Sequence, residues 1–347
     1  MAKAKKLSNM ELASFFSQIA MLQEGNILLS MGIETMLEDT TNAEGKKLLT
    51  DIKEMIDNNQ SLSSALKETG AFPDHTIHML ELGEESGKDA DISRSLADYY
   101  DRQANISESI KNAVSYPLIM ILMMIMVIIV LITKVLPIFS QVFEQLGSQM
   151  NAFSVSLMNF GSKLSSSSIA LVIILTIAVL AIVFFAKVPQ GKRLFSKFLD
   201  VFPPTVKFND AIAYSRFASG LGMTFGRMDL YVGLDLVEQL VDNPRMSAKI
   251  EKYRAAMMDG MLMHDALREA GIFSSFHCRM IAVAEGSSHL EEALSKVSDA
   301  YDKEVDRRIR GIIAILEPTL VIILSLIVGM ILLSVILPLM GIMSSIG

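Results

Sequence analysis

The sequence predicts an all-α polytopic membrane protein, in which two homologous cytoplasmic helical bundles of about six helices each are combined with three transmembrane helices. Three observations support this fold class. Of the 347 residues, 51% are hydrophobic, and many of these gather in long uncharged runs. Two halves of the chain align with each other without a gap. No segment shows the sustained period-two alternation that indicates a β-strand.

Three apolar runs are long enough to cross a membrane. Residues 118–132 are apolar without a break, and 169–186 contain a single threonine among apolar residues. A helix rises about 1.5 Å per residue, so roughly 20 residues span the ~30 Å hydrocarbon core. Buried core helices, the alternative interpretation, rarely reach such lengths. We therefore expect transmembrane helices at 116–137, 169–187 and 317–343.

The distribution of basic residues predicts the orientation of these helices. Segment 138–168 carries only two charged residues, whereas basic residues gather at the opposite ends of the spans. Because Lys and Arg accumulate on the cytoplasmic side, we expect bundles 1–115 and 188–316 in the cytoplasm. Segment 138–168 and the tail 344–347 are then extracytoplasmic, in a multi-pass protein of the cytoplasmic (inner) membrane. The basic residues concerned are Lys111, Lys187, Lys192, Arg193, Lys197, Arg307, Arg308 and Arg310.

Other features of the composition exclude some classes. The basic start MAKAKK is followed by the polar stretch SNMELASFF rather than by a long apolar region, so it does not resemble a signal peptide. The lone Cys278 excludes an intramolecular disulfide and fits a reducing compartment. The net charge of −7 sums over unlike segments and favours no class of partner.

An internal repeat organises the chain. An offset of 201 residues aligns the two halves, and the shared glycines and prolines matter most because they fix backbone geometry. Each half is a bundle of about 100 residues that leads into a transmembrane helix, and the unpaired span 169–187 returns the chain to the cytoplasm. The matched pairs include Phe16 with Phe217, Gly25 with Gly226, Gly32 with Gly233, Gly70 with Gly271, Tyr100 with Tyr301, Pro117 with Pro318 and Pro137 with Pro338.

Helix signals follow one another through the first half. Ser8 to Glu11 have the pattern of a capping box. Apolar residues at helical spacing follow from Leu12 to Leu22, and a glycine ends the helix. Further helices are predicted over 27–39, 42–58, 61–69, from 73 into 83, and from near 90 through Pro117 into the membrane.

Residues 82–88, LGEESGK, are close to a phosphate-binding loop but depart from it. That loop needs four residues between its glycines and a Ser or Thr after its lysine, whereas here three residues separate the glycines and an aspartate follows. The second half, AEGSSH at 284–289, has no lysine. Both halves keep an acidic residue and a serine, which predicts an interhelical turn in which Ser86 or Ser287 caps the next helix.

A metal site has only weak support in the sequence. His75 and His78 lie at i, i+3 with glutamates downstream, a spacing that can hold a metal. The second half has phenylalanine and arginine at the equivalent positions, so surface or capping histidines are the simpler interpretation. Glu84 and Glu85 are weak candidates for a divalent cation. No catalytic group and no cofactor site are predicted.

The predicted spans are nearly free of ionisable groups. An ion-coupled transporter or an intramembrane protease would place charges or polar pairs near the middle of the membrane. Ser325 and Gly329 instead fit close helix packing. Four methionines within 120–126 give an adaptable apolar surface. This surface contacts either lipid and neighbouring helices or a transient helical partner.

Acidic residues crowd the second and third predicted helices. A solvated surface is one interpretation, and a docking face for a basic cytoplasmic partner is the other. The residues proposed for the docking face are Glu34, Glu38, Asp39 and Glu54.

This organisation resembles the platform protein of type IV pilus and type II secretion systems, the GspF/PilC family. The resemblance covers residues 10–343. It departs from the family pattern at Ala284, where the family often has glycine, and at Lys88-Asp89, where a leucine is usual. The short N-terminal part is more similar to Gram-positive competence or pilus versions. The motifs that carry the resemblance are LGEESGK (82–88), YYDRQ (99–103), SYPLIM (115–120), AEGSSHLEEAL (284–294), AYDKEVDRRI (300–309), LEPTLVIIL (316–324) and ILPLMG (336–341).

The resemblance implies a non-enzymatic platform at the base of a pilus or secretion machine. Such a platform couples a cytoplasmic assembly ATPase to the insertion of pilin or pseudopilin subunits into a growing fibre. The partners implied are that ATPase, pilins, other membrane assembly proteins, membrane lipid and further copies of the chain, with no direct contact to nucleic acid. Mechanically important positions are expected at the turns and the prolines: Gly83, Glu84, Ser86, Gly87, Glu285, Ser287, Pro117, Pro137, Pro318 and Pro338.

Two other classes stay open at the level of sequence. An oligomeric small-solute transporter or channel subunit would need a polar pathway, which the spans do not show. An enzyme would need a metal at the acidic turn, so nucleotide and metal binding by the cytoplasmic bundles would distinguish it from a platform.

Overall fold

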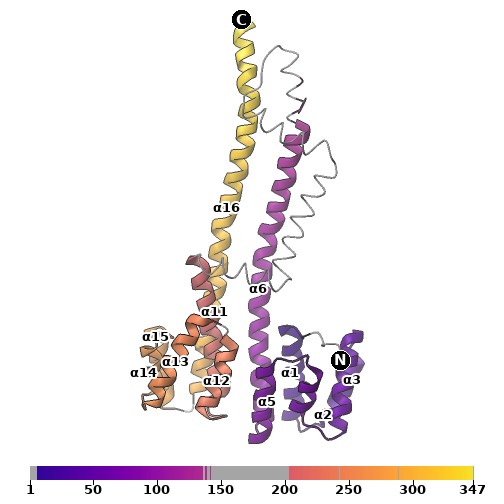
Figure 1. Cartoon of the computed structure of the whole chain (residues 1–347), viewed down its shortest axis with the longest axis vertical. Coiled ribbons are helices and arrows are strands. Elements are labelled where there is room, and N and C mark those ends of the chain that lie inside the picture. The colour runs from indigo at the N-terminus through magenta and orange to yellow at the C-terminus, as the bar shows by residue number, and fades with distance from the viewer. Residues whose placement is uncertain are drawn as a thin grey trace. The chain divides into compact units, whose positions relative to one another are not determined.

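A computed structural model describes residues 6–135, 137–138, 141, 203–241, 243–287 and 289–346. Its described residues form helices and turns, with no strand among them, as the sequence predicts (Figure 1). The predicted transmembrane helix at 169–187 lies outside these residues. The same holds for the predicted extracytoplasmic segment, apart from Ile138 and Gln141.

The chain divides into two compact units. One lies within Met1–Ser109 and Lys207–Arg307 and so contains most of both predicted bundles. The other lies within Ile110–Val206 and Arg308–Gly347 and contains the described apolar helical segments. The two bundles therefore pack as one body rather than standing apart.

The first bundle contains the six helices expected from the sequence. The fifth, α5, continues three residues beyond Gly83 to Ser86, because its turn comes at Gly87, which adopts a left-handed conformation with φ +65°. The bounds are α1 (Asn9–Glu24), α2 (Leu29–Asp39), α3 (Ala43–Asp57), α4 (Leu62–Thr69), α5 (Asp74–Ser86) and α6 (Asp89–Val130).

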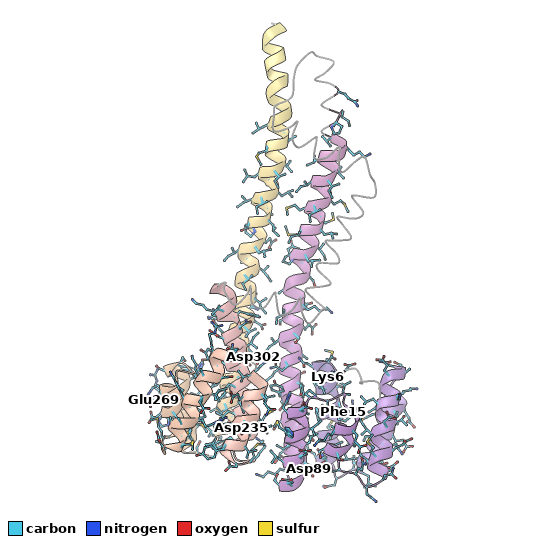
Figure 2. All side chains as sticks on the ribbon, in the orientation of Figure 1. Lys6, Phe15, Asp89, Asp235, Glu269 and Asp302 are labelled. Carbon is cyan, nitrogen blue, oxygen red and sulfur yellow. The ribbon has the colours of Figure 1, made fainter. Side chains whose placement is uncertain are left out.

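Helix α1 contributes several large side chains to the core of this bundle. The Ser8 hydroxyl accepts a hydrogen bond from the Glu11 amide, and the Glu11 carboxylate accepts one from the Ser8 amide at 2.7 Å, which is the predicted capping box. Phe15 and Phe16 are buried on its inner face, and Phe15 is labelled in Figure 2. Burying one such side chain contributes about 1.5–3 kcal/mol, so the apolar spacing read from the sequence accounts for the core.

The second bundle repeats the first. Helices α12 to α16 each begin 201 residues after the start of α2 to α6, and the glycines that end α4 and α14, Gly70 and Gly271, both have φ +64°. The helical repeat predicted from the sequence is therefore present in the fold. The bounds are α11 (Pro203–Thr224), α12 (Leu230–Val241), α13 (Pro244–Met258), α14 (Met263–Glu269), α15 (Ser275–Glu285) and α16 (Leu290–Ile346).

A repeated glutamate joins the fourth and fifth helices of each bundle. Glu84 at the end of α5 accepts hydrogen bonds from the Ser63 amide, at 2.9 Å, and from the Ser63 hydroxyl. Glu285 accepts from the amides of Met263, at 2.7 Å, and His264, at 3.3 Å. Both carboxylates thus satisfy amides in the first turn of a short helix, which has no intrahelical acceptor for them.

Replacing Glu84 with alanine is expected to lower the free energy of unfolding by about 1–3 kcal/mol, because a charge-assisted pair of hydrogen bonds is lost and the first turn of α4 loses its acceptor. Thermal unfolding of the full chain in detergent measures the effect. Glu85→Ala removes the same charge from the next, exposed position and should stay within about 0.5 kcal/mol. Equal effects of the two variants would contradict the capping role.

Helices α6 and α16 run without a break from the bundles into the apolar segments (Figure 1). Pro117 lies inside α6, and α16 contains Pro318 and Pro338. Ahead of Pro137 the backbone widens into a π-helix, Leu131–Val135. A proline ring clashes with the carbonyl four residues earlier, which falls within this π-helical turn, so the widening has a local cause.

The apolar parts of α6 and α16 are long enough to cross a membrane, and the rest of the described chain leaves them uncovered. Only 6% of the most apolar window of α6 is buried, and 0% of that of α16. A core helix of a soluble protein would bury such a surface. Exposed apolar side chains over this length are typical of helices that lie in lipid.

Candidate functional site: the junction between the two bundles

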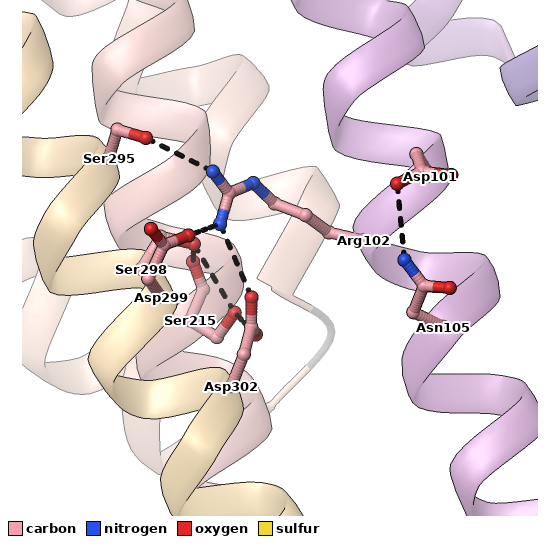
Figure 3. A network of polar contacts seen from close by, with 8 residues as sticks. All are labelled: Asp101, Arg102, Asn105, Ser215, Ser295, Ser298, Asp299 and Asp302. Atoms are coloured by element: carbon pink, nitrogen blue, oxygen red, sulfur yellow. Dashed lines mark hydrogen bonds and ion pairs between the residues drawn. The ribbon is translucent and has the colours of Figure 1, made fainter.

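Arg102 on α6 reaches across to the second bundle (Figure 3). Its Nη2 donates a hydrogen bond to the Ser295 hydroxyl at 3.0 Å. Its Nη1 forms ion pairs with Asp299 and, at 3.4 Å, with Asp302. The planar guanidinium can hold several acceptors in a fixed geometry, so one side chain ties α6 to three positions on α16.

Two serines of the second bundle support the acidic side of this network. The Ser215 hydroxyl on α11 donates to Asp302, and the Ser298 hydroxyl donates to the Ser215 carbonyl oxygen at 3.3 Å. Burial raises the pKa of Asp302, although Ser215 and Arg102 favour its ionised form. The charge on Asp302 therefore needs the nearby guanidinium to offset its desolvation.

Apolar packing and further hydrogen bonds also join the two bundles at this junction. Helix α12 packs against α5, and Leu236 and Leu240 of α12 join the buried core of the first bundle. The Lys88 ammonium donates to the Gly226 carbonyl oxygen at 2.8 Å. The Arg216 guanidinium donates to the Gln103 side chain at 2.8 Å.

A polar cavity of about 460 Å³ lies beside Arg102. Within the part of the chain that the structure describes, no group of three or more His, Cys, Asp or Glu residues is arranged to hold a metal ion. The Arg102 guanidinium instead offsets part of the negative charge of the carboxylates around it. The aspartates that line the cavity are Asp98, Asp101, Asp299, Asp302 and Asp306.

The apolar unit has a polar contact of its own. The Tyr116 hydroxyl on α6 donates to Glu317 on α16 at 3.2 Å, and the two residues are 201 positions apart, which is the offset of the repeat. Each directly precedes a repeated proline, Pro117 or Pro318. Equivalent positions of the two halves thus meet where the apolar segments begin.

The turn residues chosen from the sequence occupy two different arrangements. The Ser86 hydroxyl donates back to the carbonyls of Leu82, at 2.7 Å, and Gly83, at 3.2 Å, within its own helix. The expectation that Ser86 caps the next helix is therefore wrong. Ser86 is the last residue of α5, and the left-handed turn at Gly87 separates it from the start of α6. In the second bundle, Ser287 accepts from the amide of His289 at 3.3 Å, just before α16.

The weak metal candidates are engaged elsewhere or open to solvent. Both carboxylate oxygens of Glu84 bind Ser63, and Glu85 is exposed. The His75 Nε2 lies 2.9 Å from the Tyr100 hydroxyl. His75 therefore serves packing within the first bundle.

His75 should make the stability of the chain depend on pH. Burial lowers the pKa of His75 from its ordinary 6.5 to about 4, so the unfolded chain binds an extra proton between these values. Stability is full above pH 6.5 and is lost as pH falls through this window, by roughly 2 kcal/mol between pH 7 and pH 5. Chemical unfolding of His75→Gln across this range should lack that loss, whereas exposed His78→Gln should keep it. An unchanged pH profile for His75→Gln would contradict the assignment.

The residues proposed for docking lie on the surface of the first bundle. All four are exposed, on α2 and α3. Lys53 on the same side is paired with Asp57 at 2.9 Å, so it does not neutralise the surface. Whether this surface docks a partner stays a prediction. Its residues are Glu34, Glu38, Asp39 and Glu54.

Sequence reasoning missed the residues that join the bundles. Arg102 lies in the motif YYDRQ, one position after the repeated Tyr-Asp pair, and the equivalent residue of the second half is Lys303. Both halves thus have a basic residue at this position, and in the first half it faces several aspartates. The alignment of the two halves could have indicated this position. The sequence also did not indicate the role of Lys88, which binds a carbonyl of the second bundle.

Comparison with known proteins gives one family. The family model of type II secretion system (T2SS), protein F, matches twice, at residues 15–137 and 223–338. The two matches fall on the two halves of the repeat and cover most of the described apolar helical segments.

Characterised relatives agree with this match. The type IV pilus assembly protein PilC of Pseudomonas aeruginosa is 25% identical over 350 residues, covering 99% of this chain and 92% of the relative. PilC of Myxococcus xanthus is 26% identical and covers 96% of this chain and 80% of the relative. The type II secretion system protein F of Aeromonas hydrophila is 23% identical, with 96% and 86% covered.

The two family matches span more than half of the chain, and the fold has the two helical repeats and the apolar helices that such a protein needs. The chain, which is similar to both PilC and type II secretion system protein F relatives, is therefore a member of the T2SS protein F family of inner-membrane platform proteins.

Proposed function

We propose that this chain is the platform that couples a cytoplasmic assembly ATPase to the insertion of pilin or pseudopilin subunits into a growing fibre. The chain itself catalyses no reaction in this proposal. Nucleotide is hydrolysed by the ATPase, and the platform transmits the resulting movement to subunits held in the membrane. Both bundles face the cytoplasm and the C-terminus lies outside.

The observation that carries the proposal is the continuity of α6 and α16. Each helix starts in the packed bundles and extends, through a proline, into an apolar segment. A helix transmits rotation or displacement along its axis because its hydrogen-bonded backbone is stiff. A movement imposed on the bundles would thus reach the membrane without passing through a flexible linker.

A groove in the apolar unit supports contact with a helical subunit. It has a volume of about 240 Å³ and is lined almost wholly by apolar side chains of α6 and α16. Methionines are prominent in it, and their flexible thioether side chains adapt to different partners. The apolar segment of a pilin is a fitting occupant. Residues lining the groove include Ile119, Met120, Met123, Met124, Leu320 and Leu324.

The acidic surface on α2 and α3 supports contact with a basic surface of the motor. Its carboxylates are exposed, and an exposed acidic surface favours fast, salt-sensitive association with a partner of opposite charge. The proposal therefore places the ATPase on the first bundle.

Co-purification of the full chain in detergent with the assembly ATPase and the pilins of the same genome tests the function. Glu34→Lys combined with Glu38→Lys should reduce recovery of the ATPase at least tenfold and leave pilin recovery unchanged. The control, Asp259→Lys with Glu269→Lys, makes the same change of charge on exposed positions of the second bundle. If neither ATPase nor pilins co-purify and fibres form normally without the protein, the platform function is excluded.

A further inference from the structure

The apolar groove between α6 and α16 has a polar end. The Tyr116 hydroxyl donates to Glu317 at 3.2 Å, at the level where the two apolar segments begin. Residues three, four and seven positions apart lie on one face of a helix, and the groove lining follows Tyr116 and Glu317 at this spacing. The two side chains therefore close one end of the groove. The lining residues at these three positions are Ile119, Met120 and Met123 on α6, and Leu320, Val321 and Leu324 on α16.

Glu317 carries the only ionisable side chain of the predicted transmembrane helix 317–343. A charged side chain at the start of an apolar segment is costly unless it is paired, and such a residue marks a functional site. Among the described residues, its hydrogen-bond partner is the neutral Tyr116 hydroxyl, and no basic side chain pairs with it. The nearest basic residues on the two helices, Lys111 and Arg310, precede Tyr116 and Glu317 by five and seven positions, or about 8 and 10 Å along the helix axes.

The prolines add backbone acceptors close to this carboxylate. Pro117 and Pro318 directly follow Tyr116 and Glu317, and a proline has no amide hydrogen to donate to the carbonyl four residues earlier. Those carbonyls belong to alanine in both halves, at positions 113 and 314, one turn before Tyr116 and Glu317. An ammonium or guanidinium group, which only donates hydrogen bonds, is the complement of a carboxylate and free carbonyl oxygens.

The two parts of the groove together specify the chemistry of its occupant. The lining buries apolar side chains, and the carboxylate end pairs with a cation. A helix that crosses a membrane carries its basic residues on the cytoplasmic side, which is the side of Glu317 in the proposed orientation. An apolar helix with a basic residue just before its apolar segment therefore matches both parts.

We propose that Glu317 binds this basic group and thereby selects the pilin or pseudopilin that occupies the groove. The inference rests on the proposed function, to which it adds the residue that discriminates between subunits. The apolar lining accepts any apolar helix of suitable shape. A helix without the basic group would bury the carboxylate without a cation, and this cost rejects the wrong subunit.

Co-purification of the full chain in detergent with the pilin and the ATPase of the same genome tests the role of Glu317. Glu317→Gln removes the charge but keeps an acceptor for Tyr116, and it should lower pilin recovery at least tenfold with unchanged ATPase recovery. Tyr116→Phe removes the hydrogen bond but keeps the charge, and it should lower pilin recovery at most threefold. The control, Glu108→Gln, removes a charge from an exposed position of α6 outside the groove. Full pilin recovery by Glu317→Gln, or equal losses from Glu317→Gln and Tyr116→Phe, would overturn the inference.

Charge exchange identifies the cation. Glu317→Lys should abolish recovery of the unaltered pilin, and a glutamate in place of the basic residue nearest the apolar segment of the pilin should restore at least a third of it. A glutamine at that pilin position should lower recovery by the unaltered chain at least tenfold. If this neutral pilin is recovered as well as the unaltered one, Glu317 pairs with another amine, such as that of a lipid headgroup, and the assignment to the subunit is overturned.

The same measurements separate this inference from the proposed function. If the unaltered chain recovers no pilin, the proposed contact with the subunit fails. If pilin recovery is the same with and without the Glu317 charge, the contact stands and only the selective role of Glu317 is excluded.

Discussion

Replacing Arg102 with alanine should destabilise the junction between the two bundles by about 2–3 kcal/mol. The substitution leaves the Asp299 and Asp302 carboxylates close together without their cation, and Asp302 is already costly to ionise because it is buried. Losing one member of a desolvated pair costs more than losing an exposed one, and the half-exposure of Asp299 moderates the loss. Thermal unfolding of the full chain in detergent measures the change.

A double-mutant cycle separates the charge effect from the loss of the arginine itself. Asp302→Asn should recover at least 1 kcal/mol in the Arg102→Ala background, because it removes the uncompensated charge. The control is Arg94→Ala, which breaks the exposed pair with Glu24 and should cost under about 1 kcal/mol. Additive effects of Arg102→Ala and Asp302→Asn would contradict the coupling.

Gly32→Ala should be as damaging, through sterics rather than charge. A methyl group at Gly32 would lie 2.0 Å from Leu22 Cδ1 and 2.5 Å from its Cδ2, so either the Leu22 side chain must leave its position or α1 and α2 must move apart. We expect a loss of about 2–4 kcal/mol, typical of an overpacked or displaced core helix. Chemical unfolding of the full chain checks this value.

Relief of the clash distinguishes this explanation from a general effect on α2. Leu22→Ala removes the colliding atoms, so the double variant should be more stable than the sum of the single losses predicts. Gly286→Ala is the control, because no atom lies within 4 Å of a methyl group built there and its φ lies outside the left-handed region. A loss at Gly286 equal to that at Gly32 would rule out the steric account.

Much of the fold follows from local signals in the sequence. The capping box at Ser8, the apolar spacing of α1 and the glycine stop at Gly70 act over a few residues, and the structure has each of them. The repeat predicted the helices of the second bundle, because their first residues recur at the predicted offset. Tertiary partners did not follow: Arg102 and Asp299 are 197 positions apart, and only the fold brings them together.

The candidate functional residues were predicted only in part, because their tertiary partners also do not follow from the sequence. The repeat identified Glu84 and Glu285 as special, but it did not indicate that they accept hydrogen bonds from the first turn of another helix. Local propensity suggested a capping role for Ser86, whereas its hydroxyl binds carbonyls of its own helix. Pro117 was expected to be mechanically important, and the structure places it inside α6. A proline removes one backbone bond, which the rest of a long helix tolerates.

The most direct test of the account interrupts α6 and α16 between the bundles and the apolar segments. A flexible Gly-Ser insertion of seven residues after Ile110 and after Gly311 is compared with an alanine-rich helical insertion of the same length, which preserves the phase to within about 20°. Fibre assembly or secretion in cells is measured, together with co-purification of ATPase and pilins. The account predicts that the flexible insertion abolishes assembly while both partners still bind, and that the helical insertion retains it. Normal assembly with the flexible insertion would contradict transmission through these helices.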